Sequence, residues 1–517
     1  MKSGRPAVEV ARGASYLIAN NIVNMIVSIL AFAVIARLIS REEMGGLAVL
    51  SLLASGAQVL AGLGIDSTAV HFVASFEGTG EYEKMRRAGY GCLILNGIGV
   101  LLLVAAIYLS ADALASSLLG SISAATLIKL LTLEIAAIGI NLSLTGILVG
   151  LKRFREISLT SMVSFIIRQG LVILFLELGW GLPGLVVAWG IGASLNSFTL
   201  AAYVRKLLGP PQLGFDLFGL LRFSSPLLFG GLANYAWRWF DRALLLPFVS
   251  LAQLGSYNVA VTAYGLLSSM PSAVSGTLFP FYSKFYSERG GFAQATTLEK
   301  AVKTASRYVS FFTVPLGVGL AVTALPAATL LAGVNYADAA LPLAILSISL
   351  AATCLVTGLG QIFVVLGRTV TSGTVTIASV LVTILMGTTL VNLLGVSGAA
   401  IARALSLITT FVLSVLILRG IMVLRFDMRA YSKAWAASLL MAGVVLGFQM
   451  GFYSRYLLLV YVALGGLVYI LVLRWLHAIE PEDVDLASEF LGPKLGVLAN
   501  WAEKILGVRK NARGANR

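Results

Sequence analysis

The chain has 517 residues, of which 58% are hydrophobic and only 12% are charged, and its formal net charge is +14. An average soluble domain has about 25% charged residues, so this composition excludes an ordinary water-soluble globule and indicates a protein whose solvent is lipid. Cys92 and Cys354 lie in apolar stretches without metal-ligand or disulfide spacing, and we expect both to be buried and reduced.

Apolar blocks long enough to cross a bilayer follow one another along the chain, separated by charges, Gly or Pro. The basic residues before the first block resemble a signal sequence, but no early small-residue cleavage site follows, so we expect a retained first helix. We predict an all-α polytopic membrane protein with about 14 transmembrane helices, near residues 14–38, 47–75, 88–110, 124–150, 157–178, 184–206, 223–247, 255–282, 308–332, 339–366, 370–392, 398–418, 434–450 and 457–475.

The basic residues divide sharply between the two sides of this arrangement. Of 37 Lys and Arg residues, 29 fall on the side of the N-terminus, four lie within spans, and the opposite side holds Arg37, Arg41, Lys129 and Arg455. The positive-inside rule therefore predicts a multi-pass protein of the cell (cytoplasmic) membrane with cytoplasmic N- and C-termini. The same asymmetry favours anionic membrane lipid over nucleic acid as a partner. The short outer loops leave no room for a catalytic domain, and we predict that the chain is not an enzyme.

A weak internal repeat appears at an offset of 210 to 215 residues. Leu38-Ile39-Ser40 before Met44-Gly45 resembles Phe248-Val249-Ser250 before Leu254-Gly255. The offset contains six predicted helices, so the two copies cross the membrane in the same direction, and transporters with such parallel repeats bind substrate between the halves. We predict a six-helix lobe over 1–206, a second over 207–420, two additional helices over 421–477, and a basic amphipathic cytoplasmic tail over 478–517.

The densest intramembrane charges lie in the seventh predicted helix. Arg238, Asp241 and Arg242 share one helical face, with Trp237 beside them. One interpretation is a binding wall, in which guanidinium groups bind phosphate and aromatic rings carry sugars. The other is an internal Asp–Arg pair with interfacial Trp anchors. In either case Asp241 is expected to be a structural partner.

Other polar residues within spans are further candidates for substrate contact. Arg168 lies near the centre of its span, where we expect it to face a cavity, whereas Arg403 either lines a cavity or snorkels outward. Asn20 and Asn24 share a helical face and either bind substrate hydroxyls or bond to neighbouring helices.

The acidic residues suggest ion coupling at one position. Asp66 is the candidate for ion coupling, and we expect Glu134 to pair with Lys129. The sequence contains no metal-ligand constellation and no nucleotide-binding loop, so we expect no metal, no cofactor and no ATP hydrolysis.

Several short motifs are informative together: Asp241-Arg242, Gly255-Ser256-Tyr257 with Ala260, Leu278-Phe279-Pro280 with Ser283, Arg37-Leu38 with Glu43 and Gly45, Gly62-Leu63-Gly64, and Gly150-Leu151 with Arg153-Phe154. They resemble the polysaccharide transporter family of oligosaccharide flippases, in the superfamily that also contains multidrug and toxin extrusion proteins. The resemblance extends over roughly residues 10–430. Tyr257, which lies in one of these motifs, joins the candidate substrate-binding residues.

The resemblance implies two six-helix bundles around a central cavity, two added C-terminal helices, and alternating access. The implied substrate is an oligosaccharide linked to a polyprenyl or dolichyl (di)phosphate, and the implied partners are glycosyltransferases or a polymerase of the same pathway. A peptidoglycan-type precursor flippase and a cation-coupled multidrug exporter remain alternatives. Multidrug exporters of this superfamily usually have an acidic residue in the first helix, and the predicted first helix over 14–38 contains none.

Overall fold

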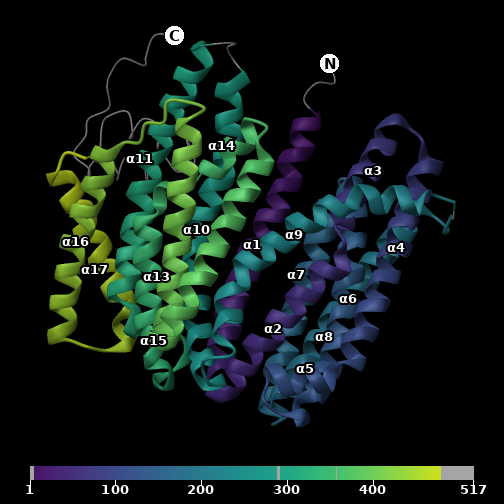
Figure 1. The fold of residues 1–517 in the computed structure, drawn as a ribbon, viewed down its shortest axis with the longest axis horizontal. Helices are drawn as coiled ribbons and strands as arrows, with labels where there is room; N and C mark the ends of the chain where they lie inside the picture. The colour runs from purple at the N-terminus through teal and green to yellow at the C-terminus, as the bar shows by residue number, and fades with distance from the viewer. Residues whose placement is uncertain (1–4, 213, 288–291, 357, 479–517) are drawn as a thin grey trace. The chain divides into compact units, whose positions relative to one another are not determined.

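The computed structural model describes residues 5–212, 214–287, 292–356 and 358–478, and every regular element within these ranges is a helix (Figure 1). Eleven helical segments there are long and apolar enough to cross a membrane. The predicted all-α polytopic fold is confirmed, and the count of 14 spans stays a prediction. The predicted amphipathic tail lies, from residue 479 onward, outside the described residues.

The helices form two compact units. Unit 1 comprises the chain up to Val259 together with Leu331–Tyr336 and Ile384–Ala399, and unit 2 comprises Ala260–Leu330, Ala337–Thr383 and the chain from Ala400. The lobe boundaries that the repeat suggests remain a prediction.

Unit 1 is built around one central helix, α6 (Ala125–Gly150), which packs against α2, α3, α4, α5, α7, α8 and η1. Its sequence includes Gly139, Gly146 and Gly150, which let neighbouring helices approach closely. The helices of this unit are α1 (Arg5–Leu38), α2 (Arg41–Gly62), α3 (Ile65–Thr79), α4 (Tyr82–Leu109), α5 (Ala111–Leu118), η1 (Ile122–Ala124), α6, α7 (Phe154–Glu177), α8 (Gly181–Leu208), α9 (Leu217–Leu245) and the first part of α10 (Leu251–Ser287).

The span predicted over 47–75 corresponds to the candidate membrane span Arg41–Thr79, but its helix breaks between α2 and α3. Leu63 and Gly64 have φ values of 49° and 71°, a left-handed conformation that glycine adopts without steric cost. The break leaves the Ala61 carbonyl to be satisfied from outside the helix, and Asn96 Nδ2 donates to it at 2.7 Å. Ser143 Oγ donates in turn to Asn96 Oδ1 at 2.7 Å, so buried polar groups from α4 and α6 support the break.

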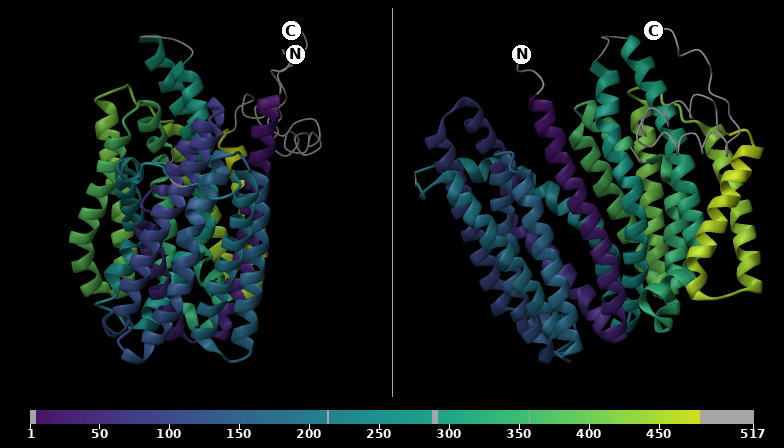
Figure 2. Two further views of the ribbon diagram at one scale, coloured as in Figure 1. Left: turned by 90° about the vertical axis from the view of Figure 1, so that its right-hand side faces the viewer. Right: turned by 180° about the vertical axis from the view of Figure 1, so that it is seen from behind.

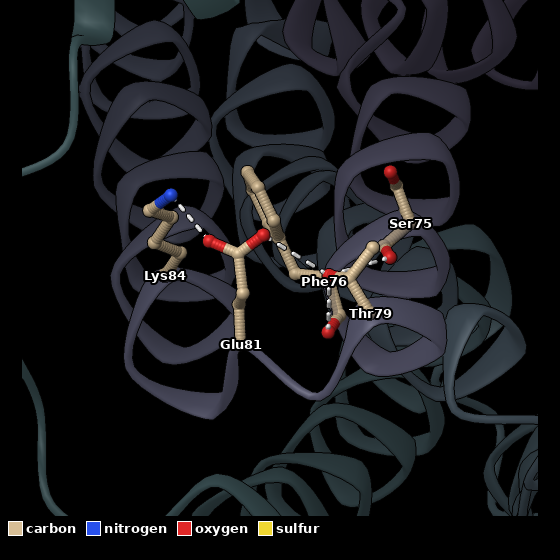
Figure 3. A network of polar contacts seen from close by, with 5 residues as sticks. All are labelled: Ser75, Phe76, Thr79, Glu81 and Lys84. Carbon is tan, nitrogen blue, oxygen red and sulfur yellow. Dashed lines mark hydrogen bonds and ion pairs between the residues drawn. The ribbon is translucent and has the colours of Figure 1, made fainter.

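The turn between α3 and α4 lies at the same end of unit 1 as the N-terminal end of α1, and α5 lies at the opposite end (Figures 1 and 2). Gly80 closes α3 with a φ of 76°, and Glu81 accepts from Lys84 and from Thr79 Oγ1, the latter at 3.2 Å (Figure 3). The hydrogen bond from Lys84 is the main cause that holds the pKa of Glu81 below its usual value, and Thr79 adds to it.

Unit 2 contains the two helices that follow the internal repeat. Tyr469 of α17 donates to the carbonyl of Phe311 at 2.8 Å, which ties the α16–α17 hairpin to α11. The elements of this unit are the rest of α10, α11 (Phe292–Val322), α12 (Ala324–Ala332), α13 (Ala340–Ala352), η3 (Cys354–Val356), α14 (Leu359–Val365), most of α15 (Thr369–Arg419), α16 (Met428–Gly451), η4 (Arg455–Leu457) and α17 (Leu458–Trp475), with η2 (Val334–Ala339) shared between the units.

Two further predicted spans depart from simple helices. The span expected over 339–366 is interrupted between α13 and α14, where Gly358 has a φ of 94°. The spans expected over 370–392 and 398–418 form the single element α15, which has a non-helical residue at Gly395. Cys92 and Cys354 are buried and free, as expected.

Candidate functional site

Two arginines of unit 1 lie over tryptophan rings. The Arg168 guanidinium of α7 lies 4.8 Å from the ring centre of Trp189 in α8, and that of Arg242 in α9 lies 4.4 Å from the ring centre of Trp239. A cation over an aromatic face is stabilised by the ring quadrupole, most strongly where water is scarce. These two pairs supply fork-shaped donors with adjacent aromatic surface, the combination expected for a phosphate-linked sugar.

Arg168 also forms an ion pair that the sequence analysis assigned differently. Its Nη2 lies 3.2 Å from Glu134 Oε1 on α6, whereas Lys129 lies 3.3 Å from Asp112 of α5. The predicted Glu134–Lys129 pair is therefore wrong. A spacing of five residues places two side chains about 140° apart around a helix, so they point in different directions.

The Arg168–Glu134 pair is buried to different depths on its two sides. Glu134 is 3% exposed and the Arg168 side chain 23% exposed, so Arg168 is the more accessible partner. Gly192 on α8 packs against the base of the Arg168 side chain, and a Cβ at this position would collide with the Arg168 Cβ. The structure thus holds the partly exposed Arg168 side chain between α6 and α8.

The end of α9 is fixed by a second buried carboxylate. Asp241 is 1% exposed and accepts a 2.9 Å hydrogen bond from the hydroxyl of Tyr257, which is fully buried in α10. Asp241 Oδ1 also accepts from the backbone N–H of Arg242 at 2.9 Å. Asp241 and Tyr257 thus join α9 to α10 across the connection at 246–250, and contact of Tyr257 with substrate stays a prediction.

Arg238 and Trp237 lie one turn earlier on α9. The Arg238 side chain is exposed, and the part of the chain that the structure describes contains no hydrogen bond or ion pair to it. Trp237 is half-buried, with its ring centre 6.4 Å from that of Phe240. Exposure of Arg238 beside the fixed Asp241 leaves its guanidinium accessible to a ligand.

The remaining candidates are distributed over other elements. Asn24 Nδ2 donates to Asn20 Oδ1 at 3.2 Å, so these residues of α1 share a face as predicted, and they bond to each other. Asp66 lies in the first turn of α3, directly after the Gly64 break, where the positive end of the helix dipole favours a carboxylate. Arg403 is half-buried in the section of α15 that belongs to unit 2.

The repeat has a structural counterpart in two matching helix starts. Ser40 and Glu43 exchange side-chain and backbone hydrogen bonds at the start of α2, a capping box. Ser250 and Gln253 do the same at the start of α10, 210 positions later. The second helix of each predicted repeat copy therefore begins with the same pattern of capping hydrogen bonds.

These two helix starts are packed tightly against each other, which the sequence analysis did not foresee. A Cβ added to Gly45 would collide with the carbonyl of Leu251, and one added to Gly255 would collide with that of Arg41 and lie 3.0 Å from the Gly45 nitrogen. Arg41 Nη2 also donates to Ser256 Oγ at 2.8 Å. We call this contact the Gly45–Gly255 seam. Gly45 faces the first residue of α10, and Gly255 faces the first residue of α2, so the two glycines make equivalent contacts across the seam.

Unit 2 contains an apolar cavity of about 490 Å³ between α11, α16 and α17. Its wall includes Phe311, Pro315, Met441, Tyr461 and Gly465. The sequence analysis missed it, because no single helix carries a pattern from which a cavity between three helices could be predicted.

Comparison with known proteins identifies the family to which the chain belongs. The family model described as "Polysaccharide biosynthesis protein" matches residues 10–286, more than half of the chain. The chain belongs to this family. The resemblance drawn from the motifs is thereby confirmed.

Two curated proteins are similar to this family member in sequence. One is the "Probable low-salt glycan biosynthesis flippase Agl15" of Haloferax volcanii, 26% identical over 294 residues, which are 56% of this chain and 59% of that protein. The other is the "Succinoglycan biosynthesis transport protein ExoT" of Rhizobium meliloti, 26% identical over 325 residues, which are 61% of each chain. The matched region thus spans about three fifths of each relative.

Solved structures with the same fold are more distant in sequence. A "Lipid II flippase MurJ, inward closed conformation" has a TM-score of 0.67 at 18% identity, covering 88% of this chain and 98% of that one. An inward-facing multidrug resistance MATE family transporter of the MOP superfamily has a TM-score of 0.61 at 17% identity, covering 78% and 97%. At these identities the likeness concerns the fold.

Proposed function

We propose that the chain is a flippase that moves an oligosaccharide linked to a polyprenyl or dolichyl (di)phosphate across the cytoplasmic membrane. The observation that carries this proposal is the pair of tryptophan-stacked arginines, Arg168 and Arg242, in a member of the polysaccharide biosynthesis family. The names of the curated relatives, a glycan biosynthesis flippase and a succinoglycan transport protein, point in the same direction.

The chemistry of such a substrate explains why arginine and tryptophan are combined. One or two phosphates carry most of the charge that must cross the apolar interior, and a guanidinium binds phosphate through two parallel hydrogen bonds. Indole rings offer flat apolar surface to a sugar ring beside these donors. Arg238 and Arg242, one turn apart on α9, would contact the phosphate, with Trp237 beside the glycan. Partner glycosyltransferases or a polymerase would supply and consume the glycan.

Alternating access would use the Gly45–Gly255 seam as its outer closure. The seam joins equivalent helix starts from the two copies of the repeat through backbone contact, and Asp241 with Tyr257 fixes the neighbouring end of α9. We propose that the seam separates when the substrate site opens outward. In this proposal both termini lie on the cytoplasmic side, as the asymmetry of the basic residues predicts.

The proposal is tested by substitution of the α9 arginines in cells that depend on this chain for surface glycan. Arg242→Ala and Arg238→Ala should lower glycan export and cause lipid-linked glycan to accumulate on the cytoplasmic leaflet. The corresponding Lys variants should recover part of the activity, because an ammonium cannot form the two-pronged contact.

Arg455→Ala is the matched control, because Arg455 stacks on Tyr456 at 4.9 Å in the connection between α16 and α17. It removes an arginine–aromatic pair outside the proposed site and should leave export unchanged. Full export by both α9 Ala variants, at equal protein levels, would remove α9 from the substrate site.

A further inference from the structure

The Glu134–Arg168 pair is a buried ion pair whose hydrogen bonding is incomplete. Glu134 Oε2 and Arg168 Nε are both shielded from solvent and lack a hydrogen-bond partner, although Oε1 and Nη2 are 3.2 Å apart. A buried ion pair compensates for lost hydration only where the remaining polar atoms are satisfied. The pair is thus poorly suited to serve only as a structural tie, and its polar atoms have unused capacity for a ligand.

The surroundings leave Arg168 as the one charged side chain that faces Glu134 among the described residues. On α5, Asp112 is engaged by Lys129, which lies five residues from Glu134 on α6 itself. Asp66 of α3 lies against Gly146, twelve residues further along α6, and α8 contributes the uncharged Trp189. For α2, α4 and η1, the other elements packed against α6, no charged side chain contacts the Glu134 carboxylate. Protonation of Glu134 would therefore release Arg168 from its counterion.

The two partners also differ in access. The Arg168 side chain is 23% exposed and Glu134 only 3%, so Arg168 is the partner that is more open to an approaching anion. The stack on Trp189 keeps the guanidinium in place when it exchanges one anionic partner for another.

We propose that Glu134 is a proton-binding site and that its carboxylate competes with the substrate phosphate for Arg168. When a proton from water forms an O–H bond at Glu134 Oε2, the carboxylate becomes neutral and the guanidinium is free to bind phosphate. Loss of that proton restores the ion pair and displaces the phosphate. This inference rests on the proposed function, and it couples proton uptake at Glu134 to phosphate binding and proton loss to phosphate release.

The test is binding of farnesyl diphosphate to the purified full-length chain, measured at about pH 5.5 and about pH 8, a range in which buried carboxyls titrate. The measured quantity is the ratio of the affinity at about pH 5.5 to the affinity at about pH 8. This ratio should be at least about fivefold larger in wild type than in Glu134→Gln, because fivefold is the lower end of usual coupling between sites. Glu134→Gln carries no titratable group there, so only the phosphates of the probe titrate in it. Asp112→Asn breaks an exposed pair on the same side of the unit and should behave as wild type.

A second measurement does not depend on the folding of Glu134→Gln. Because the guanidinium that lies on Trp189 changes partner, wild-type tryptophan fluorescence should change between the two pH values, and Trp189→Phe should lose that change. Equal pH ratios in wild type and Glu134→Gln, or an unaltered fluorescence change in Trp189→Phe, would overturn the inference while leaving the flippase proposal intact. If the affinity for farnesyl diphosphate changed with sodium concentration at constant pH and not with pH, the proton would be excluded as the ion that binds at Glu134. Absence of farnesyl diphosphate binding at both pH values would overturn both proposals.

Discussion

Gly45→Ala should hold the outer seam partly open. The added Cβ would lie closer to the Leu251 carbonyl than real Cβ atoms come to any neighbour, and the obstacle is backbone, which cannot rotate away. Overpacking of this kind costs about 1–3 kcal/mol. If about 2 kcal/mol falls on the closed seam alone, the ratio of open to closed molecules rises roughly thirtyfold, since about 1.4 kcal/mol corresponds to a factor of ten.

The assay is the rate at which an impermeant thiol reagent labels Ser256→Cys, a position that is 1% exposed inside the seam. Gly265→Ala on α10 is the matched control, because a Cβ at Gly265 meets nothing within 4 Å and Ala favours the helix. Gly45→Ala should raise the labelling rate by about one to two orders of magnitude, and Gly265→Ala should leave it unchanged. Equal rates in both variants would show that the seam is not a closed contact that opens.

Three further outcomes follow from the described contacts. Asn96→Ala should lower the free energy of unfolding by about 1–3 kcal/mol, because it leaves the Ala61 carbonyl at the α2–α3 break without its donor, and denaturation in detergent measures the loss. Glu81→Gln should lower the unfolding temperature slightly at neutral pH but not at about pH 3. The pKa of Glu81 is lower in the folded protein than in the unfolded chain, where it is about 4.3. The stabilisation by the Glu81 carboxylate is therefore present above the unfolded pKa and is lost as the pH falls through the folded pKa. Cysteines at 118 and 453 should react from outside the cell, and a cysteine at 83 only after permeabilisation, and the reverse pattern would invert the proposed topology.

The sequence predicted what depends on composition and on local spacing. Long apolar blocks were enough for an all-helical membrane protein, and the repeated Ser before Met44-Gly45 and before Leu254-Gly255 corresponds to two matching capping boxes. The shared face of Asn20 and Asn24 also follows from helical spacing alone. These features need no knowledge of how helices rotate against one another.

Features that depend on contacts between helices were not accessible from one sequence. The partner of Glu134 is on another helix, 34 positions away, and nothing in the local pattern distinguishes it from the nearby Lys129. The motif Gly62-Leu63-Gly64 was visible in the sequence, but hydropathy carries no information about backbone dihedral angles. The break between α2 and α3, where Leu63 and Gly64 have positive φ, was therefore not predicted. The Gly45–Gly255 seam required two distant glycines to be placed face to face.

The proposal that the chain is a flippase is tested most directly by reconstitution. Liposomes containing a polyprenyl diphosphate-linked oligosaccharide in both leaflets are treated from outside with an impermeant glycosidase, with and without the purified chain. With wild type, the enzyme should also digest the glycan that began in the inner leaflet, and Arg242→Ala should slow this digestion. Continued protection of the inner-leaflet glycan in the presence of folded wild-type protein, over a time in which the same preparation moves a peptidoglycan precursor or a cationic drug, would contradict the account.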